Sequence, residues 1–187
     1  MGHALVASVL EHSDPVHKVS IISRGHAAGY TLKLPFEDKK LHARREFLDD
    51  IAVSLAGYAT EKMIFGDMTT GASNDIEVAS GLARNMVGKY GMSSAIGPVN
   101  FDGGGTSIML GKGAMAERVS SEAMAAKIDE EVSKIMKEGL ARAEEVLTTH
   151  KKALDGMSEE LIKIETIERE DFEKLLILYG IKPKTRG

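Results

Sequence analysis

The sequence predicts a mainly α-helical fold, with a small β-hairpin or sheet near the N-terminus and a C-terminal helical bundle. Two observations favour this fold class. Apolar residues recur at steps of three and four over most of the chain, which is the period of helices that pack against a core. Only two short segments, both before residue 35, are instead β-branched or alternate between polar and apolar residues. The length of 187 residues indicates about one domain.

Composition excludes several classes of function. The formal net charge of -4 argues against a general nucleic-acid binder, which would carry a basic face. The absence of cysteine excludes disulfides, thiolate metal sites and thiol nucleophiles. With no tryptophan and 5% aromatic residues, stacking platforms for single strands are not expected. No apolar run approaches the roughly 20 residues that cross a bilayer, and no signal peptide is visible, so the chain taken alone is expected to be soluble and cytosolic.

The N-terminal part predicts one helix and two strands. Residues 2–12 are expected to form a short amphipathic helix that ends before Pro15, because proline disfavours helix in the residue before it. Residues 18–23 are rich in β-branched side chains, and residues 29–34 alternate, so both are predicted to be strands. We expect them to pair as a hairpin over a loop that contains Gly25.

Two helices follow. Residues 42–65 carry one apolar stripe and end at Gly66, the usual position of a glycine after a helix. Residues 74–90 form the second, with Asn74 as the predicted N-cap. Glu77, three residues later, would complete a capping box.

The remaining chain is a glycine-rich stretch followed by more helices. Residues 97–116 are expected to be a mobile surface loop, since they do not match the glycine pattern of a phosphate-binding loop. Residues 120–150 predict a long helix, and Gly156 is expected to break the pattern. Helices near 157–163 and 168–179 complete the prediction.

Residue chemistry alone gives weak candidates for a site. The histidines are His3, His12, His17, His26, His42 and His150. No two of them are four residues apart, so the chain holds no complete helical zinc motif, and each is expected by default to be a surface or core residue. Asp75 lies in the first turn of a predicted helix, where a carboxylate interacts favourably with the helix N-terminus. The serines near glycine lack the second glycine of a nucleophile elbow.

Several sequence blocks nevertheless resemble one family. They are residues 2–7, 14–21, 29–31, 69–75 and 87–93. Their sequences and their order are similar to the peptidase domain of the FtsH family, which are membrane-anchored, ATP-dependent zinc metalloproteases of peptidase family M41. The resemblance covers nearly the whole chain, to about Leu178. It implies a single peptidase domain over residues 1–187, with a metal-site half (1–116) and a C-terminal helical part (117–187).

The resemblance implies a zinc site. The family's zinc helix carries His-Glu-x-x-His, in which both histidines bind the metal from one helix face and the glutamate is the general base. His3 matches the second histidine, whereas the first histidine and the glutamate would precede residue 1, and Met1 stands directly before Gly2. Asp75 matches the third ligand. The resemblance therefore assigns His3 and Asp75 to metal binding and leaves no catalytic residue within the chain.

The resemblance also implies substrates and partners. Gly29, Tyr30 and Thr31 match the edge strand that pairs with extended polypeptide substrates, an interaction in which backbone hydrogen bonds supply affinity. A homo-hexamer is implied for the intact protein, at the cytoplasmic face of a membrane. ATP would act only through an ATPase module on the N-terminal side, and the membrane only through a segment there; neither lies within the 187 residues.

The leading hypothesis is thus an FtsH-type peptidase domain truncated within its zinc motif, inactive as it stands, with substoichiometric zinc. The alternative is a non-catalytic helical assembly or interaction module that retains the family's ring surface. A third, minor reading concerns Met1-Gly2-His3, because a free amino terminus, two amide nitrogens and a third-residue imidazole can bind Cu(II) or Ni(II) in a plane. Burial of His3 in a helix would abolish that copper site.

Overall fold

A computed structural model describes residues 1–22, 29–35, 41–101 and 121–185. Its helices are α1 (Gly2–Val9), α2 (Arg44–Phe65), α3 (Ser73–Gly88), α4 (Glu122–Thr149), α5 (Lys151–Ile164) and α6 (Arg169–Leu178), with a 3-10 turn, η1 (Thr70–Ala72), before α3. Its strands are β1 (Val16–Ser20), β2 (Tyr30–Lys33) and β3 (Thr166–Glu168). The mainly α-helical prediction with a small sheet is confirmed. The loop expected at residues 24–28 and most of the glycine-rich stretch, residues 102–116, lie outside the described residues.

The sheet is antiparallel and has the order β2-β1-β3. The predicted hairpin is confirmed, with Val19 opposite Thr31, although β1 lies two residues earlier than expected. β3 was not predicted, because three residues between two helices are too short to show an alternating pattern. It pairs Lys18 with Glu168, and the two side chains also form an ion pair.

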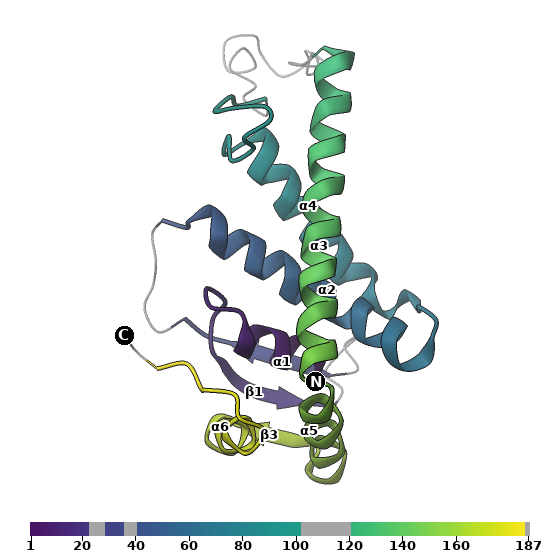
Figure 1. Cartoon of the computed structure of the whole chain (residues 1–187), viewed down its shortest axis with the longest axis vertical. Helices are drawn as coiled ribbons and strands as arrows, with labels where there is room; N and C mark the ends of the chain where they lie inside the picture. The colour runs from purple at the N-terminus through teal and green to yellow at the C-terminus, as the bar shows by residue number, and fades with distance from the viewer. Residues whose placement is uncertain (23–28, 36–40, 102–120, 186–187) are drawn as a thin grey trace, which may run out of the picture.

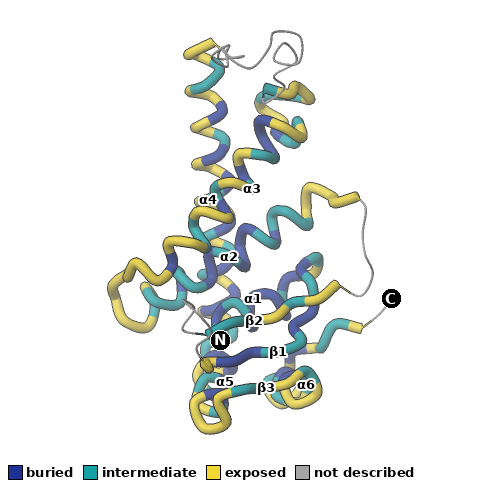
Figure 2. Tube along the Cα trace, turned by 180° about the vertical axis from the view of Figure 1, so that it is seen from behind, coloured by how far each residue is buried: buried dark blue, intermediate teal, exposed yellow. Residues whose placement is uncertain are grey.

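The helix α4 is the long axis of the structure, as Figure 1 shows. Helix α3 lies beside its N-terminal half, while α1, the sheet, α5 and α6 gather near its C-terminal end. Figure 2 shows that burial is concentrated where α1 and α2 meet this axis. Two apolar clusters result, one between α2, α3 and α4 and one around α1, and residues from both predicted halves of the chain contribute to each.

Helix α1 is not amphipathic as expected but almost entirely buried. It contacts α2, α4, α5 and β1, so apolar or small residues occupy nearly every face. Gly2 is required at its start, because a Cβ there would lie 2.1 Å from the Thr60 Oγ1 and 3.1 Å from the Ala56 carbonyl oxygen of α2. A helix without a polar face is typical of a core position.

Two predictions about helix ends are wrong. Asn74 is not the N-cap of α3, because η1 runs directly into the helix and places Ala72 at the cap and Asn74 inside. Gly156 does not break a helix but lies within α5, where a Cβ would come 1.8 Å from the Tyr179 hydroxyl oxygen. The glycine at 156 therefore permits close packing of the segment after α6, a long-range contact that local sequence cannot reveal.

Within the described ranges, no helix combines the length and the apolar character needed to cross a membrane.

Candidate metal centre

His3 is presented by the first turn of α1, which is fixed on α2. Its Nδ1 lies 2.8 Å from the Val53 carbonyl oxygen. A carbonyl can only accept, so this contact places the ring hydrogen on Nδ1 and leaves the lone pair on Nε2. A backbone carbonyl that orients the second nitrogen of an imidazole is the usual support of a metal-binding histidine.

Asp75 is presented by the first turn of α3, which begins after the short turn η1. That turn is held against α2 by Glu61, whose Oε2 accepts hydrogen bonds from the Thr69 amide (2.9 Å) and the Thr69 hydroxyl (3.0 Å). The Thr69 Oγ1 in turn accepts from the Gly71 amide at 3.1 Å and caps η1. Glu61 thus positions the backbone that leads into Asp75.

The two predicted ligands meet although 72 positions separate them. The His3 Nε2 and the Asp75 Oδ2 are 3.2 Å apart, and both side chains are about one-third exposed. Gly57 of α2 lies beneath them. A Cβ at position 57 would be 2.8 Å from the His3 Nε2 and 3.5 Å from the Asp75 Oδ2. The absence of a side chain at Gly57 is therefore what gives the His3 Nε2 and the Asp75 Oδ2 their space.

The arrangement fits one side of a zinc site. Two ligand atoms bound to one tetrahedral zinc at about 2.0–2.1 Å lie about 3.3 Å apart, close to the observed separation. In the absence of metal, the same contact requires a hydrogen atom between the Nε2 and the Oδ2, because both atoms otherwise present lone pairs. Across the described part of the chain, no group of three or more histidine, aspartate or glutamate side chains converges as a complete metal site would require. The structure brings the two predicted ligands, His3 and Asp75, together, and their binding of a metal stays a prediction.

The other candidates lie elsewhere. The His17 Nε2 is 3.2 Å from the Arg169 guanidinium, and His42 and His12 lie beside Glu46 and Glu11 respectively. His26 is outside the described residues. His3 lies within α1 with its Nδ1 engaged by Val53, which is the condition under which we expect the planar copper site at Met1-Gly2-His3 not to form.

Tyr30 and Thr31 lie in β2, which is an outer strand among the described residues, and their contact with substrate stays a prediction. β2 pairs with β1 on one side and is the terminal strand in the sheet order. Gly29 immediately precedes the strand, and a Cβ there would lie 2.7 Å from the Ser20 carbonyl oxygen. Glycine at 29 thus allows the backbone to enter the sheet closely against β1.

Three supporting residues were missed by the sequence analysis: Val53, Gly57 and Glu61. They share one helix, α2, and act through a carbonyl, a missing side chain and a carboxylate. Gly57 and Glu61 are four residues apart, so they lie on the same face of α2. A glycine within an otherwise regular helix was the available signal, because such a residue often marks a close approach.

Comparison with known families defines the class of the protein. The sequence profile of peptidase family M41 matches residues 1–175, and the chain belongs to that family.

The chain is similar to several proteins that are all named ATP-dependent zinc metalloprotease FtsH. The chain is 48% identical over 177 residues to an ATP-dependent zinc metalloprotease FtsH of Pseudothermotoga lettingae, and 46% identical over 176 residues to the FtsH of Thermotoga maritima. It is also 46% identical over 176 residues to FtsH 1 of Conexibacter woesei. Each alignment covers 94% of this chain but only 27 to 29% of the relative, so the chain spans less than a third of the length of these proteins.

Proposed function

We propose that the chain is the peptidase part of a zinc metalloendopeptidase that hydrolyses unfolded or misassembled proteins. The observation that carries this proposal is the approach of the His3 Nε2 to the Asp75 Oδ2 at 3.2 Å above Gly57. The names of its relatives, all ATP-dependent zinc metalloproteases, support the same chemistry. A bound zinc ion supplies Lewis-acid activation for peptide-bond hydrolysis.

The residues of this chain would hold and orient the metal. His3 binds through Nε2 while the Val53 carbonyl fixes the ring and increases the basicity of the imidazole. Asp75 contributes a carboxylate oxygen from a turn that Glu61 holds in place. Because Gly57 contributes no side chain, the face of α2 beneath the ligands remains open to them.

A polypeptide that consists of these 187 residues alone is proposed to be inactive. It supplies His3 and Asp75 but neither the first histidine of the zinc motif nor the glutamate that accepts a proton during attack on the peptide bond. Loss of a general base lowers a rate by about 10²–10⁴-fold, and loss of a ligand weakens zinc binding as well. Negligible hydrolysis of casein and substoichiometric zinc are expected.

Substrate polypeptides are proposed to add to the sheet beside β2, in contact with Gly29, Tyr30 and Thr31. The supporting observation is the position of β2 at the end of the strand order β2-β1-β3. Addition of an extended segment to a sheet edge binds backbone rather than particular side chains, which suits a protease of broad specificity.

Assembly and energy supply are proposed to involve the rest of a longer protein. We expect a homo-hexamer in the intact protein, ATP hydrolysis by a module outside residues 1–187, and attachment to the cytoplasmic face of a membrane through a segment that is also outside. Large apolar side chains on the surface, such as Phe65 (75% exposed) and Leu178 (73% exposed), support an assembly with further protein surface. Light scattering of the 187-residue polypeptide tests whether this part assembles by itself.

Completion of the zinc motif tests the proposed activity. Placing His-Glu directly before Met1 extends α1 by two residues and puts the new histidine four positions before His3, on the same helix face. The extended polypeptide should bind one zinc per chain and hydrolyse casein in a chelator-sensitive manner, whereas the 187-residue polypeptide should do neither.

Two matched controls separate metal binding from general-base catalysis. Extension with His-Gln restores the ligand but not the base, so zinc binding should return without hydrolysis. Asp75→Asn in the His-Glu polypeptide removes a charged ligand and should weaken zinc binding. Zinc-dependent hydrolysis by the unextended 187-residue polypeptide would contradict the proposal, as would unchanged zinc affinity after Asp75→Asn.

A further inference from the structure

The segment that follows α6 turns back across the fold. It leaves the helix through Gly180, whose φ of 73° lies in the left-handed region that favours glycine. Ile181 then enters the apolar cluster around α1, with only 6% of its surface exposed, and its amide donates to the Leu176 carbonyl at 2.8 Å. Residues 181–185 therefore form a docked strap rather than a free tail.

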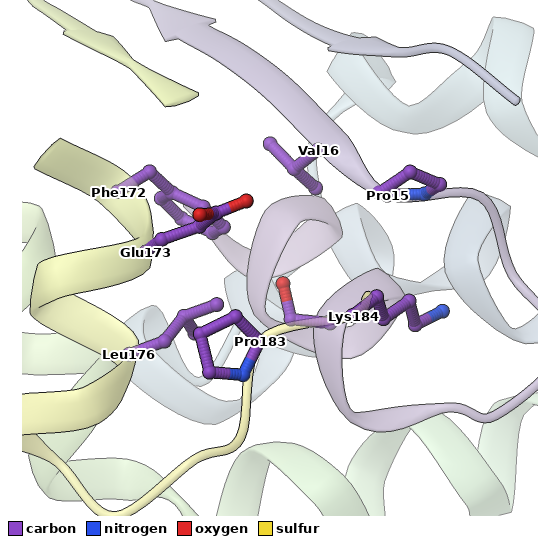
Figure 3. Close-up of a pocket in the computed structure, with 8 residues that line it drawn as sticks. Pro15, Val16, Phe172, Glu173, Leu176, Pro183 and Lys184 are labelled. Atoms are coloured by element: carbon purple, nitrogen blue, oxygen red, sulfur yellow. The ribbon is translucent and has the colours of Figure 1, made fainter. Parts of the chain in front are cut away.

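The strap closes a small cavity against the first elements of the chain. Figure 3 shows Pro183 and Lys184 of the strap together with Phe172, Glu173 and Leu176 of α6, and with Pro15 and Val16 at the start of β1. The cavity measures about 10 Å³, room for about one water molecule. All strap residues lie beyond residue 175, where the match to the peptidase family ends.

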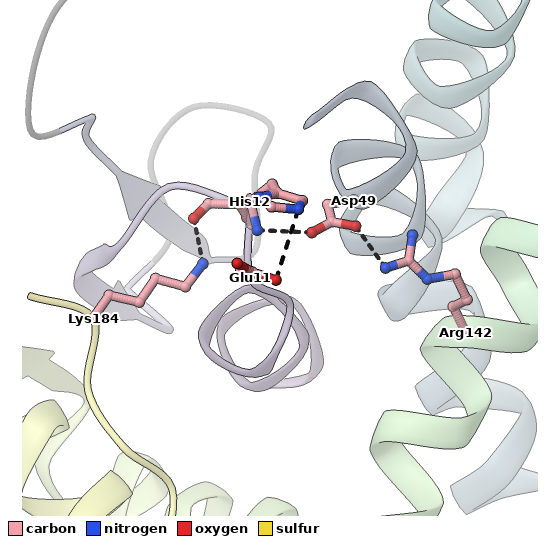
Figure 4. A network of polar contacts seen from close by, with 6 residues as sticks. Glu11, His12, Asp49, Arg142 and Lys184 are labelled. Carbon is pink, nitrogen blue, oxygen red and sulfur yellow. Dashed lines mark hydrogen bonds and ion pairs between the residues drawn. The ribbon is translucent and has the colours of Figure 1, made fainter. Parts of the chain in front are cut away.

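Lys184 fastens the strap to the turn between α1 and β1. Its ammonium donates a hydrogen bond to the Ser13 carbonyl oxygen, which Figure 4 shows beside the His12 contact. The same turn is held from the other side by Asp49 of α2, whose Oδ2 accepts from the His12 amide at 2.9 Å. The Asp49 Oδ1 accepts from Arg142 of α4 at 2.6 Å. One short turn thus joins the strap to α2 and α4.

We propose that residues 181–185 act as a latch on the turn between α1 and β1, and that the latch closes more tightly when Lys184 loses a proton. The geometry supplies the parts of such a device: a glycine pivot at Gly180, an apolar anchor at Ile181 and a half-buried amine at Lys184. A neutral amine still donates to the Ser13 carbonyl, so loss of the proton removes the penalty of burying a charge without removing the hydrogen bond.

Burial of Lys184 sets the direction in which closure of the strap depends on pH. Burial lowers the pKa of Lys184 from 10.5 to about 8, chiefly by desolvation, against the opposing effect of Asp49. The other charged groups that act on the amine are Lys33 of β2, Asp14 of the turn and Asp50 of α2. Glu173 of α6 lines the same cavity as Lys184 and forms an ion pair with Arg169. The closed strap therefore binds fewer protons than the open strap between pH 8 and 10.5, and closure is favoured as the pH rises through that window. From pH 7 to pH 9 the closing equilibrium constant should increase about tenfold.

Hydrogen exchange of the Ile181 amide in the full 187-residue chain tests the latch. Exchange rates are divided by the intrinsic rate at each pH, so that the protection factor reports opening of the strap. The protection factor should rise about tenfold from pH 7 to pH 9, and that of the His12 amide should rise with it.

Two variants identify the titrating group. Lys184→Met should remove the pH dependence of the Ile181 protection factor. Lys184→Gln, which keeps a polar end but has no titrating group, should remove it as well. Lys182→Met, which alters an exposed lysine of the same strap, should retain the tenfold rise. A wild-type protection factor that stays constant between pH 7 and 9, or that rises equally in Lys184→Met, would overturn the proposal.

Discussion

A methyl group at position 57 should disturb the metal centre without unfolding the protein. In Gly57→Ala, the new Cβ would lie 2.8 Å from the His3 Nε2 and 3.1 Å from the His3 Cε1, whereas ordinary contacts of a Cβ begin at 3.4 Å. The imidazole must therefore move by about 0.6 Å, which exceeds the tolerance of about 0.2 Å in a zinc–ligand distance. Displaced support of a ligand typically lowers metal affinity 10- to 100-fold, and that is the expected loss.

The effect on folding should be small, because two contributions oppose each other. Alanine stabilises a helix interior by about 1 kcal/mol relative to glycine, while overpacking costs about 1–3 kcal/mol. Since His3 is about one-third exposed, the ring can move outward, and the net change in unfolding free energy should stay within about 1 kcal/mol of zero.

The assay is competition for zinc between a chelator and the polypeptide extended by His-Glu, with denaturant unfolding measured in parallel. Gly81→Ala is the matched control, because it makes the same change in helix α3 at a site where a Cβ meets no atom within 4 Å. This control should gain up to about 1 kcal/mol of stability and keep its zinc affinity. Equal zinc affinities in Gly57→Ala, Gly81→Ala and the parent would refute the reasoning about the space beneath His3.

Four further substitutions test other parts of the structure. Asp49→Ala removes a carboxylate that is 1% exposed and pairs with Arg142. Because the Arg142 side chain is 41% exposed, water can replace its lost partner. Urea unfolding should therefore show a loss of about 2–3 kcal/mol in the free energy of unfolding. Asp50→Ala, next to it and half-exposed, should lose less than about 1 kcal/mol. Glu61→Gln keeps the shape of the side chain but weakens its hold on the turn before α3, and should lower zinc affinity in the extended polypeptide about tenfold with little change in Tm. Gly156→Ala must displace the Tyr179 hydroxyl and should lower Tm, unlike Gly81→Ala; a rise in Tm would contradict the packing described for α5.

The sequence was sufficient to predict the helices and strands whose residue pattern lies within the element itself. Helical periodicity located α2 and α4 to within two residues, and the β-branched and alternating segments located the hairpin. β3 was missed because its pairing with β1 depends on residues about 150 positions away. Gly156 was misread for the same reason, since its partner Tyr179 is brought close only by α6.

The residues of the candidate site also divide into those that the sequence identified and those that only the structure revealed. His3 and Asp75 were found through resemblance, and neither spacing nor composition pairs them. Gly57 left only the general signal of a glycine inside a helix, and Glu61 left none, because one acts by lacking a side chain and the other through the turn before Asp75. What the structure adds is that residues of a single helix, α2, hold both proposed ligands in place.

The central claim is that His3 and Asp75 bind one zinc ion side by side above Gly57. A crystal structure of the zinc-loaded polypeptide extended by His-Glu tests it most directly. The His3 Nε2 and an Asp75 carboxylate oxygen should each lie about 2.0–2.2 Å from the same zinc. A zinc ion bound without Asp75, or through the Nδ1 of His3, would contradict the account.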